Sequence, residues 1–237
     1  MAAPLVIITG ASQGIGRASA LAFARAGHSL LLLARHAAAL GELAGAPHRF
    51  AEVDVADFAS FAAAVAEAEA AFGPADCLVN NAGFLRVGDL GSRSPDDLDR
   101  DVDVLFNGVL HGIRAVLPGM TARRRGTIIN VSSVGDRKPG PLAATYHASK
   151  AAVRSLSESL QQAEAKNNVR IINIAPGFVK TNIHADMGIS FEDYSRQLGN
   201  PEFIAPERIA DIILFCYQQP QAICIRDLVV MPTTSAY

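Results

Sequence analysis

Two residues that could carry out chemistry together stand four positions apart in the segment "TYHASKAAV", residues 145–153. In a helix, positions i and i+4 lie on the same face, so the phenol of Tyr146 and the ammonium of Lys150 share one environment. A nearby positive charge favours the phenolate and lowers the pKa of a tyrosine from its usual value of about 10. The pair therefore predicts a tyrosine that donates and accepts a proton near neutral pH, tuned by Lys150.

A second segment with chemical meaning is "TGASQGIGRA", residues 9–18, which directly follows an apolar run. Glycines at 10, 14 and 16 allow a tight turn and a close approach by a ligand, and the helix that follows directs its unpaired N–H groups over the turn. The spacing is G-x-x-x-G-x-G, which differs from the G-x-G-x-x-G pattern of many dinucleotide sites. A strand, a glycine turn and a helix in this order still predict a pyrophosphate site.

Short apolar runs alternate with longer amphipathic or alanine-rich stretches along the chain. Continuously apolar strands indicate a sheet covered on both faces, and strict alternation indicates parallel strands with right-handed crossovers. The sequence therefore predicts one Rossmann-type domain over 1–237, with a doubly wound sheet of about seven mostly parallel strands. The expected strands are 5–9, 29–34, 49–53, 77–80, 127–131, 170–174 and 227–230, and the expected helices are near 14–26, 58–72, 95–122, 143–166 and 206–217.

Composition narrows the class of partner. Half of the 237 residues are hydrophobic and the net charge is only -2, which argues against disorder and against a general electrostatic grip on nucleic acid. No apolar run approaches the roughly 18 residues of a membrane span, and the start lacks the basic region of a signal sequence. Three cysteines without a C-x-x-C spacing argue against a disulfide framework and fit a reducing cytoplasm. We therefore expect a small-molecule partner, no nucleic acid and no membrane.

Other polar features suggest no additional site. The aspartates at 97, 99, 101 and 103 lack the glycine and the bidentate glutamate of a calcium loop, and the histidines have no metal-ligand spacing, so no metal is expected. His147 directly follows Tyr146. Because consecutive helical residues diverge by roughly 100 degrees, we expect His147 to face away from the chemistry.

Six motifs in register make the chain resemble the short-chain dehydrogenase/reductase family over essentially its whole length. They are "TGASQGIG" at the first turn, "NNAG" at 80–83, the asparagine at 107, "INVSS" at 129–133, "YHASK" at 146–150 and "APGFVKT" at 175–181. The resemblance implies a nicotinamide cofactor at the carboxyl ends of the strands. It also implies the family's habit of forming homodimers or homotetramers.

The resemblance assigns catalytic roles to Asn107, Ser133, Tyr146 and Lys150. Tyr146 would be the acid for carbonyl reduction and the base for alcohol oxidation. Ser133 would hold the carbonyl oxygen, with Ser132 as its rival, and Asn107 would order a water against Lys150.

The resemblance also implies which residues bind the cofactor. Arg35 stands at the end of the second strand, where NAD enzymes usually carry an acid, and can pair with a 2′-phosphate, so we expect NADP(H). Asp54 would contact the adenine, with a turn or helix-cap role alone as the alternative. The full expected set is Gly10, Ser12, Gly14, Ile15, Gly16, Arg35, Asp54, Val55, Asn80, Ala82, Gly83, Tyr146, Lys150, Pro176, Gly177, Val179 and Thr181.

The expected function is therefore an NADP(H)-dependent oxidoreductase that interconverts a carbonyl and an alcohol. Two alternatives within enzymes are a 3-hydroxy acid or serine dehydrogenase and a 3-oxoacyl reductase, and a third is a non-catalytic NADP(H) sensor. Residues 182–201 lie where the family has a variable lid over the substrate. Apolar residues there and nearby predict an apolar carbonyl substrate, whereas three cations could instead hold a carboxylate. The apolar set is Ile183, Met187, Ile189, Phe191, Tyr194, Leu198, Phe84, Leu85 and Phe178, and the cations are Arg86, Arg137 and Lys138.

Overall fold

Seven parallel strands form one sheet in the computed structural model, which describes residues 3–36, 47–187 and 189–235. Their order is β3-β2-β1-β4-β5-β6-β7, in which the strand order reverses between β1 and β4. The predicted doubly wound α/β fold is thereby confirmed. The strands are β1 Leu5–Thr9, β2 Ser29–Ala34, β3 His48–Glu52, β4 Ala75–Asn80, β5 Gly126–Val131, β6 Val169–Pro176 and β7 Asp227–Val230.

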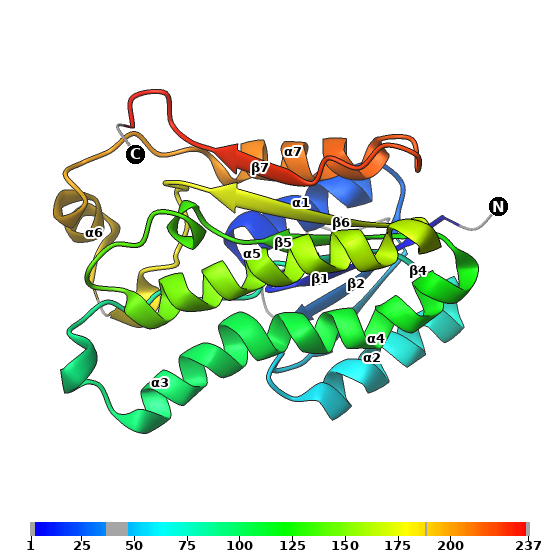
Figure 1. Cartoon of the computed structure of the whole chain (residues 1–237), viewed down its shortest axis with the longest axis horizontal. Helices are drawn as coiled ribbons and strands as arrows, with labels where there is room; N and C mark the ends of the chain where they lie inside the picture. Colours follow the sequence, from blue (N-terminus) through cyan, green and yellow to red (C-terminus); the bar gives the residue numbers. More distant parts are fainter. Residues whose placement is uncertain (1–2, 37–46, 188, 236–237) are drawn as a thin grey trace.

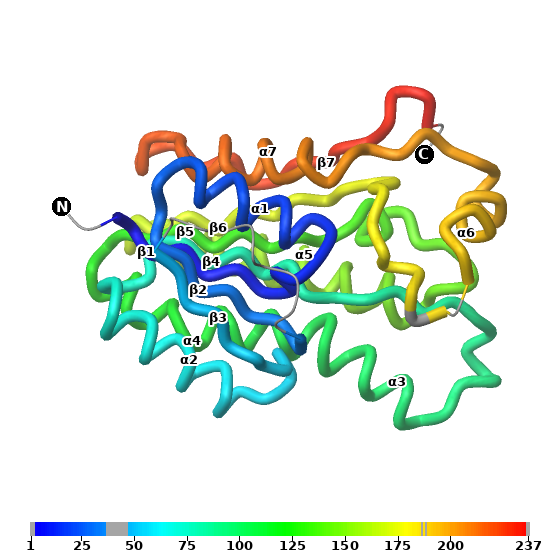
Figure 2. Tube along the Cα trace, turned by 180° about the vertical axis from the view of Figure 1, so that it is seen from behind, coloured from blue at the N-terminus to red at the C-terminus, as the bar shows by residue number. Residues whose placement is uncertain are grey.

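Helices cover both faces of this sheet (Figure 1). The described helices are α1 Gly14–Arg25, α2 Phe58–Phe72, α3 Pro95–Val102, α4 Gly108–Arg123, α5 Ala144–Glu164, α6 Phe191–Gln197 and α7 Pro206–Gln218. Helices α1 and α7 lie on one face, and α2, α4 and α5 lie on the other (Figures 1 and 2). The short helical segments are η2 Leu90–Ser92, η3 Asp103–Asn107, η4 Val134–Asp136, η5 Ala165–Asn167 and η6 Ala185–Met187.

Alternate residues of each central strand enter two separate apolar cores. On β1, Val6 and Ile8 pack with Phe23 of α1 and with α7, whereas Leu5 and Ile7 pack on the side of α2, α4 and α5. Every residue of β1 is buried because both faces are covered. A strand buried on both faces needs apolar residues at every position, which explains the uninterrupted apolar sequence of β1.

The structure differs from the sequence prediction within the expected helix 95–122. The chain there forms α3, then one π-helical segment, η3, and then α4. The side chain of Asn107 donates a hydrogen bond to Oδ1 of Asp103 over 2.8 Å across this segment. A π turn accommodates one extra residue within a helix, and no residue type marks where it occurs, so the sequence pattern did not reveal it.

The carboxyl ends of the strands all point toward the end of the molecule that carries α3 and α6 (Figures 1 and 2). The 182–201 segment lies there too and contains η6 and α6. Ligands of open parallel sheets bind outside these strand ends, near the point where the strand order reverses. The fold therefore positions any site at this edge.

Two glycines of α4, one packed against the sheet and one not, allow the contact between this helix and the sheet to be tested. A methyl group at Gly112 would overlap Oδ1 of Asn80 and crowd Leu78 and Phe61, whereas one at Gly119 would meet only the flexible end of Arg123. We expect Gly112→Ala to lower the free energy of unfolding by about 1–3 kcal/mol. We expect Gly119→Ala to leave it unchanged or raise it by up to about 1 kcal/mol, because alanine is the better helix former. Urea unfolding measures both, and equal stabilities would contradict this account of the helix–sheet contact.

Candidate functional site

One large cavity of about 720 Å³ opens at the carboxyl ends of the strands. It begins at the glycine turn after β1, passes the ends of β2, β3, β4, β5 and β6, and reaches the 182–201 segment. Most of the residues expected to bind the cofactor line it. The exceptions are Gly16 and Asn80, and the catalytic candidate Asn107 also lies outside its lining.

The glycine turn forms one end of the cavity. Gly10 and Gly14 have φ values of 65° and 54°, which only glycine adopts readily. Helix α1 begins with no side-chain cap from Gln13, so its first N–H groups are available to a ligand in the cavity. An uncapped helix N-terminus beside glycines fits the pyrophosphate of a dinucleotide.

Gly16, which is expected to bind the cofactor, lies outside the cavity lining and packs against the turn. A Cβ at Gly16 would overlap the carbonyl oxygen of Gly10 and the side chain of Asn81. This glycine lets α1 pack closely against the turn and does not itself face the cavity.

Charged residues surround the cavity beside the ends of β2 and β3. Arg35 and Asp54 line it, together with Arg100 from α3. Oδ1 of Asp54 accepts a hydrogen bond of 3.0 Å from the N–H of Ala56, and Oδ2 forms an ion pair of 2.6 Å with Arg100. Burial acts to raise the pKa of Asp54, but these hydrogen bonds and the charges of Arg100 and Arg35 together hold it below its ordinary value. Asp54 therefore combines the turn role with a place on the cavity wall.

The two asparagines of "NNAG" point in opposite directions. Asn80 is buried beneath the sheet, where its side chain donates to Oδ1 of Asn130 over 2.9 Å, and it does not reach the cavity. Asn81 lines the cavity instead, and its amide group donates to the carbonyl of Thr9 over 3.0 Å. The cofactor contact expected of Asn80 stays a prediction, and Asn81 is a cavity residue that the sequence reasoning did not name.

Tyr146 and Lys150 are both buried on the cavity wall, on the same face of α5. Nζ of Lys150 donates a hydrogen bond of 2.8 Å to the carbonyl of Val131 at the end of β5. The same Nζ lies 5.8 Å from the centre of the Tyr146 ring. The predicted proximity of the two residues is therefore present.

The predicted tuning is not found among the protein groups alone. Burial raises the pKa of Tyr146, while a hydrogen bond with Ser133 acts in the opposite direction and the charge of Asp136 adds to the increase. Burial also lowers the pKa of Lys150 to about 8, with Asp136 opposing that change. The loss of water around both groups outweighs their mutual influence, which helix spacing cannot reveal.

Ser133, and not its neighbour Ser132, has its hydroxyl beside Tyr146. Its Oγ accepts a hydrogen bond of 3.1 Å from Gly135 and interacts with the phenol. The hydroxyl of Ser132 is directed to Oδ2 of Asp136 at 2.9 Å, with the carbonyl of Lys150 at 3.3 Å. The hydroxyl of Ser132 is therefore already used in hydrogen bonds within the protein.

His147 lies closer to the site than expected. Its ring lines the cavity and meets the Tyr146 ring edge to face, with centroids 5.6 Å apart. Nδ1 is held by the backbone N–H of Gly140 at 3.0 Å. The expectation that His147 faces away was wrong because the loop after β5 folds back over α5 and extends the cavity to this side.

The end of the cavity opposite the glycine turn is mainly apolar. Its walls include Phe84, Leu85, Phe178, Ile183, Met187, Tyr194 and Leu198. Phe191 and Ile189, which were expected there, lie outside the cavity lining, and Phe191 packs on Phe203 with ring centroids 4.9 Å apart.

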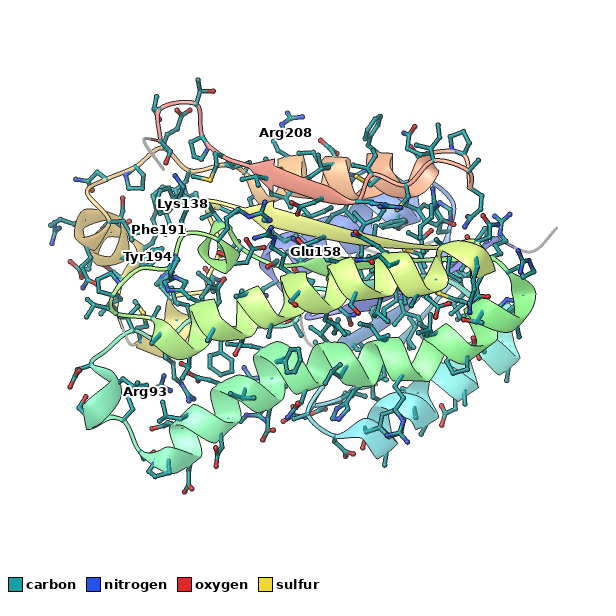
Figure 3. All side chains as sticks on the ribbon, in the orientation of Figure 1. Arg93, Lys138, Glu158, Phe191, Tyr194 and Arg208 are labelled. Atoms are coloured by element: carbon teal, nitrogen blue, oxygen red, sulfur yellow. The ribbon has the colours of Figure 1, made fainter. Side chains whose placement is uncertain are left out.

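The three cations named with the apolar set differ in their surroundings. Arg86 pairs with Asp97 at 3.0 Å, and Arg137 pairs with Asp136 and Asp227 at 2.6 and 2.8 Å. Lys138 is exposed and lines the cavity. In Figure 3 it lies at the same end of the molecule as Phe191 and Tyr194.

Comparisons with known proteins agree with this geometry. The chain belongs to the short-chain dehydrogenase family, whose model matches residues 4–189. It is 44% identical over 181 residues to the oxidoreductase UcpA of Salmonella typhimurium, covering 74% of this chain and 69% of that protein. The chain is thus an oxidoreductase of this family.

Two solved structures illustrate the breadth of the similarity. A serine dehydrogenase in its closed form with NADP+ superposes with a TM-score of 0.92 at 29% identity, covering 98% of this chain and 96% of that one. A 3-oxoacyl-[acyl-carrier protein] reductase from Brucella melitensis superposes with a TM-score of 0.84 at 28% identity, covering 96% and 90%.

Two further observations concern membranes and metals. No helix among residues 3–36, 47–187 and 189–235 is both long enough and apolar enough to cross a membrane. Within the same described part of the chain, His, Cys, Asp and Glu side chains do not gather in threes in a way that could hold a metal ion.

Proposed function

We propose that the protein is an NADP(H)-dependent enzyme that interconverts a carbonyl group and an alcohol, with Tyr146 as the acid and base. The observation that carries the proposal is the grouping of Tyr146, Ser133 and Lys150 on the wall of the cavity that starts at the uncapped N-terminus of α1. A bound nicotinamide dinucleotide supplies or accepts the hydride. The residues of the chain hold this cofactor, orient the substrate and move the proton.

The cavity lining supports a dinucleotide along the strand ends. The N–H groups that follow Gln13 would face the pyrophosphate, and Thr181, close enough to Gly14 that a Cβ there would be 3.1 Å away, would close the turn from the other side. Asn81, Ala82 and Gly83 would lie under the sugar next to the nicotinamide. Pro176, Gly177 and Val179, which also line the cavity, would hold the nicotinamide amide.

Tyr146 holds a proton that it can give to the carbonyl oxygen. Burial raises the pKa of the phenol, which keeps this proton in place at neutral pH but makes its transfer harder, so the groups around Tyr146 must stabilise the phenolate that the transfer leaves. Ser133 would hold that oxygen beside the phenol. The ammonium of Lys150 would then stabilise the phenolate, and Asn107, behind the cavity wall, would order a water that returns the proton.

A non-catalytic cofactor sensor is the alternative outside enzymes. A sensor needs the cavity and the glycine turn, but it has no need for a buried ammonium beside a buried phenol. Burying such groups costs free energy, so their presence favours the enzyme.

The substrate end of the cavity supports an apolar carbonyl compound. Arg86 and Arg137 are engaged in ion pairs and lie outside the cavity lining, and most of the wall at this end is aromatic and aliphatic. Removing apolar surface from water stabilises a complex by roughly 25 cal/mol per Å². Medium-chain or aromatic ketones, aldehydes and oxoesters fit this wall.

A small 3-hydroxy acid is the second candidate substrate. Lys138 lines the cavity, where its ammonium could hold a carboxylate, and the NADP+-bound neighbour is a serine dehydrogenase. These two observations support this alternative.

We also propose that the enzyme acts in the cytoplasm as a homodimer or homotetramer. All three cysteines are free thiols, which supports a reducing compartment. The oligomeric state follows the habit of the family.

Tyr146→Phe tests the reaction itself. Removing the hydroxyl should reduce kcat by a factor of about 100 or more and change NADPH affinity far less, because the positioned acid is lost while most of the residues expected to hold the cofactor remain. Tyr217→Phe is the matched control, since Tyr217 binds Asp76 at 2.7 Å outside the cavity lining. Steady-state rates from NADPH absorbance and binding from NADPH fluorescence measure the two effects. Full activity in folded Tyr146→Phe protein would refute the proton role.

Arg35→Ala tests the cofactor preference. The wild-type enzyme should have a higher kcat/KM with NADPH than with NADH. The variant should lose about 10- to 100-fold of the NADPH value, as expected for a charged hydrogen bond, with little change for NADH. Arg49→Ala is the control, because Arg49 pairs with Glu67 on the outer strand β3 and does not line the cavity. Equal losses for both cofactors would contradict a contact with the 2′-phosphate.

Lys138→Ala separates the two candidate substrates. For apolar ketones and oxoesters we expect kcat/KM to change less than about twofold, because the ammonium does not contact them. If a 3-hydroxy acid is the better substrate, the same variant should lose about 10-fold or more of kcat/KM through KM. Lys166→Ala, at η5 and outside the cavity lining, is the control. The apolar proposal is wrong if serine or 3-hydroxypropionate is preferred over every apolar substrate and that preference depends on Lys138.

A further inference from the structure

A buried carboxylate follows Ser133 in the loop after β5 and has no part in the proposed reaction. The side chain of Asp136 is fully buried, and the residue ends η4, the turn that follows Ser133. An isolated charge in such a place would cost several kcal/mol, so its partners need an explanation.

Four hydrogen bonds hold this carboxylate. Oδ1 accepts from Nε of Arg137 at 2.6 Å, and Oδ2 accepts from Ser132 at 2.9 Å, from Asn173 at 3.2 Å and from Nη2 of Arg137 at 3.2 Å. The backbone N–H of Asp136 also donates to the carbonyl of Ser133 over 2.9 Å. Asp136 is thus attached both to the serine pair and to β6, which bears Asn173.

The network continues to the last strand of the sheet. Arg137 forms two parallel hydrogen bonds with Asp227 of β7, at 2.8 and 3.0 Å, and Asp227 accepts a third from Asn173 at 2.9 Å. Bidentate arginine–carboxylate pairs have fixed geometry. The position of Asp136 is therefore set by residues of β6 and β7 as well as by its own loop.

We propose that Asp136 is a positioning residue for Tyr146 and Lys150: held by Arg137 and Asn173, it fixes the turn that carries Ser133, is linked through the Ser132 hydroxyl to α5 at the carbonyl of Lys150, and favours the ammonium form of that lysine. This inference deepens the proposed function and rests on it for its catalytic meaning. The charge effect itself is a property of the folded chain and can be measured without any substrate.

The charge has a definite consequence for Lys150. Burial lowers the pKa of this lysine to about 8, and Asp136 acts against that change. The same charge raises the pKa of Tyr146. Both effects keep the protons on the pair at neutral pH, so that the site holds an ammonium and a neutral phenol, the state needed to reduce a carbonyl.

Other charged groups lie on the elements around the pair. Within the described residues, Asp136 is the one whose charge acts on both Tyr146 and Lys150. The titratable and charged groups on the surrounding elements are Arg137 after η4, Asp227 on β7, His147 and Arg154 on α5, Asp103 on η3, Arg93 and Asp101 beside Thr145, and His184 and Tyr194 in the 182–201 segment.

NMR titration of Lys150 tests the proposal in the whole chain. The protein has four lysines, so lysine labelled at Cε gives few signals, and Lys150→Arg assigns the relevant one. In Asp136→Asn the titration midpoint of Lys150 should fall by about one pH unit, because the charge that favours the ammonium is gone. Asp227→Asn is the matched control: it weakens the same network but leaves the Asp136 charge, so it should lower Tm without moving the midpoint.

The remaining outcomes would each support or overturn the proposal. An unchanged midpoint in folded Asp136→Asn overturns it, and an equal fall in Asp136→Asn and Asp227→Asn shows that loosening of the network, not the charge, controls Lys150. If Asp136→Asn does not fold, Arg137→Met removes the compensating cation, and the midpoint should then rise; no rise overturns the proposal. Activity is read separately: a shifted midpoint with no turnover in the wild-type protein would retain the charge effect and reject the proposed function.

Discussion

The structure of the site depends on one interaction, the hydrogen bond from the buried ammonium of Lys150 to the carbonyl of Val131. A buried cation is tolerated only where polar groups replace its water. Strand β4 pairs with β5 only as far as Asn130, and Val131, one residue later, provides its carbonyl to the lysine. The site is thus located where β5 stops pairing with β4, while its pairing with β6 continues through Val131.

Helix α5 has to keep Lys150 beside the carbonyl of Val131, and hydrogen bonds from the sheet hold the helix in this position. A chain of hydrogen bonds runs from Asn80 on β4 through Asn130 on β5 to Ser157 on α5, with both links 2.9 Å long. Near the other end of α5, Gln161 donates to the carbonyl of Ile171 over 3.2 Å. These contacts hold α5 to the sheet about two and three turns after Lys150. The helix therefore has little freedom to move along its axis relative to the end of β5.

The sequence predicted features that depend on residue type and period. Apolar strands such as β1 and the glycine turn at Gly10 and Gly14 define the fold, and four-residue spacing brings Tyr146 and Lys150 together. Properties that depend on tertiary contacts were beyond that reasoning. The π turn before Gly108, the raised pKa of Tyr146 and the return of the loop over His147 all arise from packing between segments far apart in the chain.

The role of Asp136 likewise depends on tertiary contacts that the sequence does not show. In the sequence it is one aspartate in a polar loop, and its neighbour Arg137 is one possible substrate cation. Only the register that sets Asn173 opposite Asp227 on β6 and β7 turns these residues into a fixed network.

The central claim is that the cavity holds NADP(H) with its nicotinamide at Tyr146 and its phosphates at the N-terminus of α1. A crystal structure of the protein with NADP+ tests this most directly. The account predicts the nicotinamide ribose against Tyr146 and Lys150, the pyrophosphate over Gly14 and the 2′-phosphate beside Arg35. A cofactor bound outside the cavity, or with its nicotinamide directed away from Tyr146, would contradict it.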